Sequence, residues 1–233
     1  MTGAGSNTAP KTSLMAICGW AFSGFTGSAD VSAFHPLSVM PLLGRQDEGV
    51  STRVERFLAH LDGLSGGVEP QFWPIESTAP GHEGLTAIGY RDMVEDGLLI
   101  GVTYGLSLTR QESWRLGRPE LSISVRSDDP AWVLAIAYLA EQLRHNCPFN
   151  HGDTINFGEP VASGSSLDGF VVFGPLAFDT NDATVDVGDD LPIVIVGMYP
   201  TYAIEREFIS ENGLGAFWNL DWDPYDVARP PAV

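Results

Sequence analysis

The feature that most constrains the fold of this chain is a strand, helix and strand pattern between Arg118 and Pro160. From Glu120 to Arg126, apolar and polar side chains alternate strictly. A period of two places alternate residues on the same side of a strand, so Leu121, Ile123 and Val125 share one face. The pattern predicts a strand that is buried on that face and exposed on the other.

A helix is predicted to follow this strand, over residues 130–145. Asp129 can cap free backbone N–H groups, and a proline fits the first helical position. At about 100° per residue, one apolar stripe of the helix consists of Trp132, Ile136, Leu139 and Leu143. Leu134 and Tyr138 face nearly the opposite way, and the only polar turn is the last one, with Glu141, Gln142 and Arg144. A helix that is apolar on most sides is typical of the centre of a domain, so we expect other segments of this protein to pack on both sides of it.

The rest of the chain alternates between predicted strands and helices. A capping-box spacing, Thr52 to Glu55, begins a helix over residues 52–62, and Gly63 is positioned to end it. Another helix is predicted over residues 203–212, with Ile204 and Phe208 inward and Gly213 at its end. Further strands are predicted over residues 85–90, 98–108, 154–157, 170–173 and 191–198. This order predicts an α+β fold, with one mixed, mainly antiparallel β-sheet flanked by a few helices.

One face of the predicted strand 98–108 is small, because Gly101 and Gly105 lie on it. Glycines in a strand leave room for a close neighbour, and the simplest neighbour is a helix or loop of this same protein. Because a short run, 109–117, leads back to the strand around Leu121, the two strands are predicted to be antiparallel neighbours.

Composition separates a predicted domain, residues 50–233, from an N-terminal extension, residues 1–49. The extension is rich in Gly, Ser, Ala and Thr without a clear period, so we expect it to be poorly ordered. The alternative is that it docks onto the domain through Trp20, Phe22 and Phe25.

The charge of the chain restricts its partners. With 30 acidic and 12 basic residues its formal net charge is −18, which repels nucleic acid and anionic membranes and attracts basic partners. Two cysteines, Cys18 and Cys147, do not make a disulfide framework, so a cytoplasmic location is expected. No apolar run approaches the ~20 residues that a membrane span needs.

Catalytic and metal-binding motifs are weak in this sequence. In the run from Gly164 to Asp168 an aspartate stands where a serine nucleophile motif needs its second glycine. His145, Cys147 and His151 have the chemistry of zinc ligands, but their spacing matches no regular zinc module. We therefore expect no enzyme activity, no cofactor and no metal, and we keep a metal-dependent enzyme that uses these three residues as the less favoured alternative.

Two acidic segments are the candidate partner-binding residues. The first is a loop with Asp179, Asp182, Asp186, Asp189 and Asp190, which lacks the glycine and glutamate that a calcium-binding EF-hand loop requires and is expected to be solvated. The second is a tail that mixes aromatic and acidic residues, with Trp218, Asp221, Trp222, Asp223, Tyr225 and Asp226. Such a mixture suits a surface that binds a basic protein, and the alternative is that its tryptophans anchor the C-terminus on the core.

Several short motifs follow one another between residues 85 and 220. They are Tyr104–Ser107, Arg118–Leu121, Trp132 with Leu139, His151–Ile155, Pro160, Ser166–Pro175, Val196–Met198, Glu205–Phe208 and Gly213–Leu214. Their order and spacing resemble the Suppressor of fused domain. The resemblance implies a protein-binding domain rather than an enzyme. Eukaryotic members of that family bind transcription factors with two domains, of which this chain is long enough for one.

Bacterial single-domain relatives are viewed as immunity proteins of polymorphic toxin systems, and a small acidic chain resembles these more closely. Our first hypothesis is therefore an immunity protein that binds and neutralises a basic toxin domain. The alternative is a peptide-binding regulator or scaffold without a toxin partner. The oligomeric state is not predicted.

Overall fold

The computed structural model describes residues 51–78 and 81–233, so the predicted extension, residues 1–49, lies outside the described residues. The helices are α1 (Arg53–Ser65), α2 (Ala131–Leu143), α3 (Ala203–Asn212), α4 (Leu214–Trp218) and the 3-10 turn η2 (Leu106–Leu108). The strands are β1 (Gln71–Ile75), β2 (Leu85–Arg91), β3 (Leu98–Tyr104), β4 (Arg118–Arg126), β5 (Thr154–Asn156), β6 (Gly169–Phe173), β7 (Thr184–Val185) and β8 (Ile193–Thr201).

All eight strands belong to one sheet with the order β1-β2-β3-β4-β8-β6-β5, and β7 pairs with the first residues of β8. Every pairing is antiparallel except that of β4 with β8. The predicted α+β class with a mixed, mainly antiparallel sheet is confirmed, and so is the antiparallel pairing of β3 with β4. The sequence did not predict β1, because Pro74 interrupts it. Proline is tolerated there because β1 is an edge strand.

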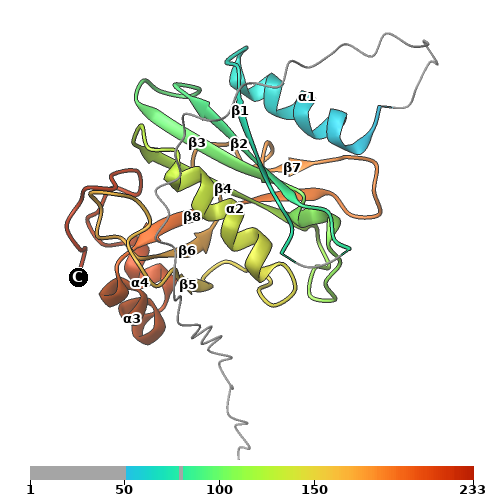
Figure 1. Ribbon diagram of the computed structural model, residues 1–233. Coiled ribbons are helices and arrows are strands. Elements are labelled where there is room, and N and C mark those ends of the chain that lie inside the picture. The colour runs from blue at the N-terminus through green and yellow to red at the C-terminus, as the bar shows by residue number, and fades with distance from the viewer. Residues whose placement is uncertain (1–50, 79–80) are drawn as a thin grey trace, which may run out of the picture.

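Helices cover both faces of the sheet. Figure 1 shows α2 lying across the front of the sheet, with α3 and α4 beside β5 and β6. Trp132, Ile136 and Leu139 of α2 pack on the face that carries Leu121, Ile123 and Val125. Residues of α1, including Phe57 and Leu61, pack in a second cluster with Ile88, Ile100 and Ile195, which come from β2, β3 and β8. The prediction that β4 is exposed on one face is therefore wrong. Other segments of the protein cover its second face as well, where Glu120 and Ser122 are buried.

Gly101 lies where α2 comes closest to the sheet. A Cβ built on Gly101 would lie 2.8 Å from Val133 Cγ2 and 3.0 Å from Ile123 Cγ2, which confirms that a helix of this same protein uses the space. By contrast, a Cβ on Gly63 would meet nothing within 4 Å. Gly63 was predicted to end α1, but the helix continues to Ser65 and ends at Gly66, which has a left-handed φ of 61°.

This contrast gives a testable pair of substitutions. Gly101→Ala should lower the free energy of unfolding by about 1–3 kcal/mol, because Val133 must move away from the new methyl group. Gly63→Ala should raise it by about 0.5–1 kcal/mol, because alanine favours the helix and meets no atom. Urea unfolding of both variants measures the two changes. Equal effects in both variants would contradict the close contact between α2 and β3.

Other helix details also differ from the prediction. Pro130 is the N-cap of α2 rather than its first residue, although Asp129 still accepts a hydrogen bond from the Ala131 N–H at 2.9 Å. The last turn of α2 is polar, as predicted, but its Glu141 and the following Arg144 form a buried ion pair. In α3, Ile204 is exposed, and the buried residues are Glu205, Arg206 and Ile209.

Glu120 joins β4 to the end of β3 through a fully buried carboxylate. Its Oε1 accepts hydrogen bonds from Gly105 N–H (2.8 Å), Ser107 N–H (3.0 Å) and Ser107 Oγ (2.5 Å), and its Oε2 accepts one from Thr103 Oγ1 (2.7 Å). Burial raises the pKa of Glu120, and these four donors oppose that rise. Because the carboxylate has no exposed surface, its role is to hold the turn after β3.

Among the described residues, no helix is long and apolar enough to cross a membrane.

Candidate functional site

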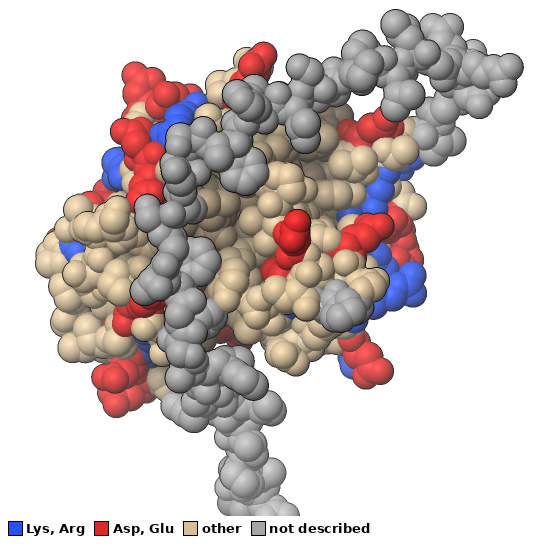
Figure 2. Space-filling view, viewed as in Figure 1, with Lys and Arg blue, Asp and Glu red and all other residues tan. Residues whose placement is uncertain are grey.

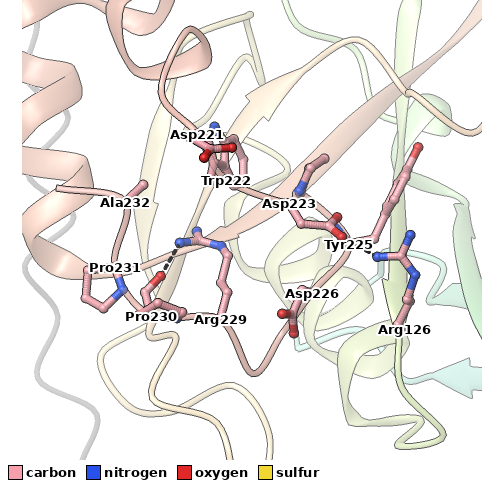
Figure 3. Close-up of a pocket in the computed structure, with 11 residues that line it drawn as sticks. Arg126, Asp221, Trp222, Asp223, Tyr225, Asp226, Arg229, Pro230, Pro231 and Ala232 are labelled. Carbon is pink, nitrogen blue, oxygen red and sulfur yellow. Dashed lines mark hydrogen bonds and ion pairs between the residues drawn. The ribbon is translucent and has the colours of Figure 1, made fainter.

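The C-terminal tail forms a pocket at the end of β4. Arg126 is the last residue of β4, and its N–H donates to the carbonyl of Tyr225 at 2.8 Å, so the tail passes beside the end of this strand. The cavity has a volume of about 570 Å³ and is lined by Arg126, residues 221–226 and residues 229–232. We call this cavity the C-terminal pocket (Figure 3). It contains the acidic residues of the predicted tail site.

The carboxylates of the C-terminal pocket differ in how they are bound. Asp223 pairs with Arg126 at 2.5 Å, and its other oxygen accepts from the Tyr225 N–H at 2.9 Å. Burial alone would raise the pKa of Asp223, but these hydrogen bonds hold the pKa below its usual value. Asp226 accepts from the Ala228 N–H at 2.8 Å, whereas Asp221 is exposed and makes no hydrogen bond or ion pair within the described residues.

Arginine side chains lie against the aromatic rings of this region. Arg229 Cζ lies 4.7 Å from the centre of the Trp222 ring and 5.5 Å from that of Tyr202. Arg126 Cζ lies 5.5 Å from the centre of the Tyr225 ring. Guanidinium groups are attracted to aromatic faces. The pocket therefore combines the two kinds of group, carboxylate and aromatic ring, that bind basic side chains.

A buried ion pair fixes the tail to α3. Glu205 is 0% exposed, and its two oxygens accept from Arg229 Nη1 at 2.5 Å and Nη2 at 2.8 Å. Arg229 Nη2 also donates to the carbonyl of Pro200, and Glu205 Oε1 accepts from the Ala232 N–H at 2.9 Å. These hydrogen bonds hold residues 229–232 beside α3 and the end of β8.

The tryptophans of the tail pack in an aromatic cluster. Trp218 lies 4.6 Å from Phe173, 5.1 Å from Tyr199 and 5.3 Å from Trp222, measured between ring centres. Trp222 also lies 4.7 Å from Phe217, which is fully buried. Both tryptophans remain partly exposed, so they anchor the tail and still present ring surface.

The other predicted segment, the acidic loop, surrounds β7. Asp179 and Asp186 are exposed, and Asp182 is partly exposed. Asp189 instead accepts from Arg53 Nε at 2.8 Å and Arg118 Nη1 at 3.2 Å, and Arg118 also pairs with Asp190. Asp189 is exposed, as expected for the loop, but it also joins α1 to β4 through two largely buried arginines.

Asp189→Asn should therefore reduce stability, whereas Asp179→Asn should not. Without the Asp189 carboxylate, the positive charges of Arg53 and Arg118 are only partly neutralised. Charge-assisted hydrogen bonds contribute about 1.5–3 kcal/mol each. We expect the free energy of unfolding to fall by about 1–2 kcal/mol in the Asp189 variant. The change in the Asp179 variant should stay within about 0.5 kcal/mol. Denaturant unfolding of the two variants tests this, and equal values would show that Asp189 contributes nothing to the fold.

The structure does not assemble the residues of the alternative metal site. His145 lies edge to face with His82 at 5.1 Å, His151 lies 5.2 Å from the Phe173 ring, and Cys147 packs against the main core. Within residues 51–78 and 81–233, no group of three or more His, Cys, Asp or Glu side chains is arranged to hold a metal ion.

The sequence did not identify the arginines of the C-terminal pocket. Arg126 and Arg229 are 103 residues apart (229 minus 126), and their carboxylate partners Glu95 and Glu205 lie in other segments. No local spacing links these residues. The one available signal was the scarcity of basic residues, 12 in the whole chain, because a rare charge inside an acidic chain is expected to have a carboxylate partner.

Charge is unevenly distributed on the molecular surface. Figure 2 shows acidic and basic side chains around the rim of one face, and few in its middle, where α2 lies. This agrees with the sequence of α2, which has no charged residue from Ala131 to Ala140.

Comparison with known proteins gives one matching family. The family model of Suppressor of fused protein (SUFU) matches residues 81–230, which is more than half of the chain and includes most of the C-terminal pocket. No curated protein sequence matches the chain significantly.

Solved structures of this kind share the fold. A putative SUFU homolog from Neisseria gonorrhoeae FA 1090 has a TM-score of 0.62 and 20% identity, with 76% of this chain and 94% of that chain covered. A structure of the Sufu-Fu complex has a TM-score of 0.57 and 12% identity, with 76% and 90% covered. Drosophila Suppressor of Fused has a TM-score of 0.59 and 11% identity, with 81% of this chain but 54% of that chain covered.

Proposed function

This chain belongs to the Suppressor of fused family, and we propose that it binds a basic protein partner through the C-terminal pocket. The observation that carries the proposal is the composition of that pocket. Three carboxylates, from Asp221, Asp223 and Asp226, share it with the rings of Trp222 and Tyr225. Aromatic residues are enriched at protein interfaces, and a field of negative charge speeds association with a basic partner.

The way in which this region binds the chain's own Arg126 supports a partner that presents lysine or arginine. Arg126 pairs with Asp223 and Glu95 and lies against the Tyr225 ring. The side chains of Arg126 and of its two carboxylate partners all remain almost half exposed. A lysine or arginine of a partner would find the same groups at the same surface. The loop from Asp179 to Asp190 has no aromatic residue, and its Asp189 and Asp190 pair with Arg118, so it offers carboxylates without the rings of the tail and is the weaker candidate.

Within this class we propose an immunity protein that acts in the cytoplasm by binding and neutralising a basic toxin domain. The net charge of −18 supports a basic partner. The structurally similar Sufu protein was solved in a Sufu-Fu complex, and this favours a second candidate, a regulator that binds a partner without any toxin. An enzyme that uses His145, Cys147 and His151 is not supported by their positions in the described residues.

The test separates these two candidates. The genes beside this chain's gene are searched for a toxin domain, which is then expressed in a host with and without the chain while growth is measured. The immunity proposal predicts that growth is restored and that the two purified proteins form a stable complex. Continued toxicity with no complex, or the lack of a toxin gene in the neighbourhood, would contradict immunity and favour the regulator.

A further inference from the structure

A second cavity, of about 420 Å³, lies where the start of β2, the turn after η2 and the end of α2 meet. It shares no residue with the C-terminal pocket. Four of the side chains that line it can donate N–H groups, and they are His82, Arg110, Arg144 and His145. Glu83 is the only acidic residue of the lining. In a chain with 30 acidic residues, this is an unusual concentration of donors.

Arg144 is buried in the wall of this cavity, and part of its guanidinium has no partner. The side chain is 4% exposed, and it pairs with Glu141 through Nη2 and donates to the carbonyl of Glu83 through Nη1 at 3.1 Å. Its Nε is buried and has no hydrogen-bond acceptor. A buried donor without an acceptor costs about 1–3 kcal/mol, so the wall of the cavity holds more donors than acceptors.

Arg110 and the two histidines complete the donor set. Most arginines of the described residues form ion pairs with carboxylates, but Arg110 is exposed and its side chain forms no ion pair or hydrogen bond there. His82 and His145 lie edge to face with their ring centres 5.1 Å apart. A neutral imidazole carries one N–H, so each ring can donate to a bound group.

The carbonyl end of α2 does not cancel this positive character. A helix C-terminus carries partial negative charge on its free carbonyls. Here Leu143 O accepts from the N–H groups of Asn146 and Cys147, both at 2.9 Å. Arg144 O accepts from Gln111 Nε2 at 2.5 Å. These carbonyls already have donors, so they do not compete for the N–H groups of the cavity.

We propose that this cavity binds a small molecule through an anionic oxygen group, either a carboxylate or a phosphate. The oxygens accept hydrogen bonds from Arg110 and from the imidazoles of His82 and His145, and Arg144 forms the cationic wall behind them. The volume lies within the range of small-molecule sites, about 300–1,000 Å³. Leu108, which also lines the cavity, offers apolar contact to the rest of the ligand. This site is independent of the protein-binding proposal.

The test is a titration of the full chain with inorganic phosphate and, separately, with acetate at constant ionic strength, followed by NMR shifts of backbone amides. One saturable site is expected, with shifts at residues 81–83 and 108–110. Arg110→Gln should weaken binding about tenfold or more, because one charge-assisted hydrogen bond is lost. Glu83→Gln should tighten it, because the only carboxylate of the lining is removed.

Arg115→Gln is the matched control, because Arg115 is also exposed, makes no ion pair among the described residues and does not line the cavity. It should bind like the wild type. Saturation by phosphate or by acetate, retained in the Arg115 variant and weakened in the Arg110 variant, supports the site and identifies the preferred group. No saturable binding of either anion, or equal weakening in both arginine variants, would overturn the proposal.

Discussion

Replacing Trp132 with alanine should lower the free energy of unfolding by about 3–5 kcal/mol. Trp132 is 1% exposed on the face of α2 that packs against Leu121, Ile123 and Val125. Truncation removes the largest fully buried side chain among the described residues and leaves a cavity between helix and sheet. A loss of this size is a large part of the total stability of an ordinary domain, about 5–15 kcal/mol.

Urea unfolding followed by circular dichroism measures this change. Leu134→Ala is the control on the same helix, because Leu134 is only partly buried. It should cost clearly less, about 1 kcal/mol. If the Trp132 variant lost no more stability than the Leu134 variant, then α2 would not be the central element that the structure describes.

Breaking the ion pair between Glu205 and Arg229 should cost a comparable amount. Either Glu205→Gln or Arg229→Met leaves a buried partner without its counter-charge, and such single changes typically cost about 3–5 kcal/mol. The double variant should be more stable than the sum of the two losses predicts, because it leaves no unpaired charge.

A double-mutant cycle with the wild type, both single variants and the double variant measures the coupling. We expect a coupling of at least about 1 kcal/mol, since contacting residues in one network do not act additively. Additive losses would show that the two side chains act separately. The tail would then be held by its aromatic contacts rather than by this ion pair.

Local periodicity predicted most regular elements, and it predicted the charged residues poorly. The predicted strand 98–108 is wrong after Tyr104, because Gly105 has a positive φ of 124° and the chain turns into η2. The alternation around Ile123 and the apolar stripe of α2 gave a strand and a helix close to their observed limits, because both depend on neighbours in sequence. Burial of Glu120, Glu141 and Glu205 could not be predicted in this way. Each of these carboxylates is buried because donors from another segment surround it.

The candidate site was predicted in part for the same reason. Acidic and aromatic residues are visible in the sequence, so the tail from Asp221 to Asp226 was identified before its pocket was known. The sequence could not show that Asp189 is paired with Arg53 and Arg118 while Asp221 is free. That difference comes from how α1, β4 and the loop meet in the folded chain.

The most direct test of the account compares two variants with the same change of charge. The tail variant carries Asp221→Asn, Asp223→Asn and Asp226→Asn, and the loop variant carries Asp179→Asn, Asp182→Asn and Asp186→Asn. The loop variant leaves Asp189 and Asp190 in place, so the ion pairs of Arg118 are kept. Unfolding experiments on both variants first establish that each is folded.

The decisive measurement is the association rate of each variant with the purified partner across a salt series. The partner is first identified by cross-linking to the full chain. Exposed charges act over about 8 Å at physiological ionic strength, so only carboxylates near the interface should matter. The account predicts that the tail variant loses about tenfold or more in rate at low salt, together with the salt dependence, while the loop variant behaves like the wild type. Equal losses in both variants, or a loss in the loop variant alone, would contradict a partner site at the C-terminal pocket.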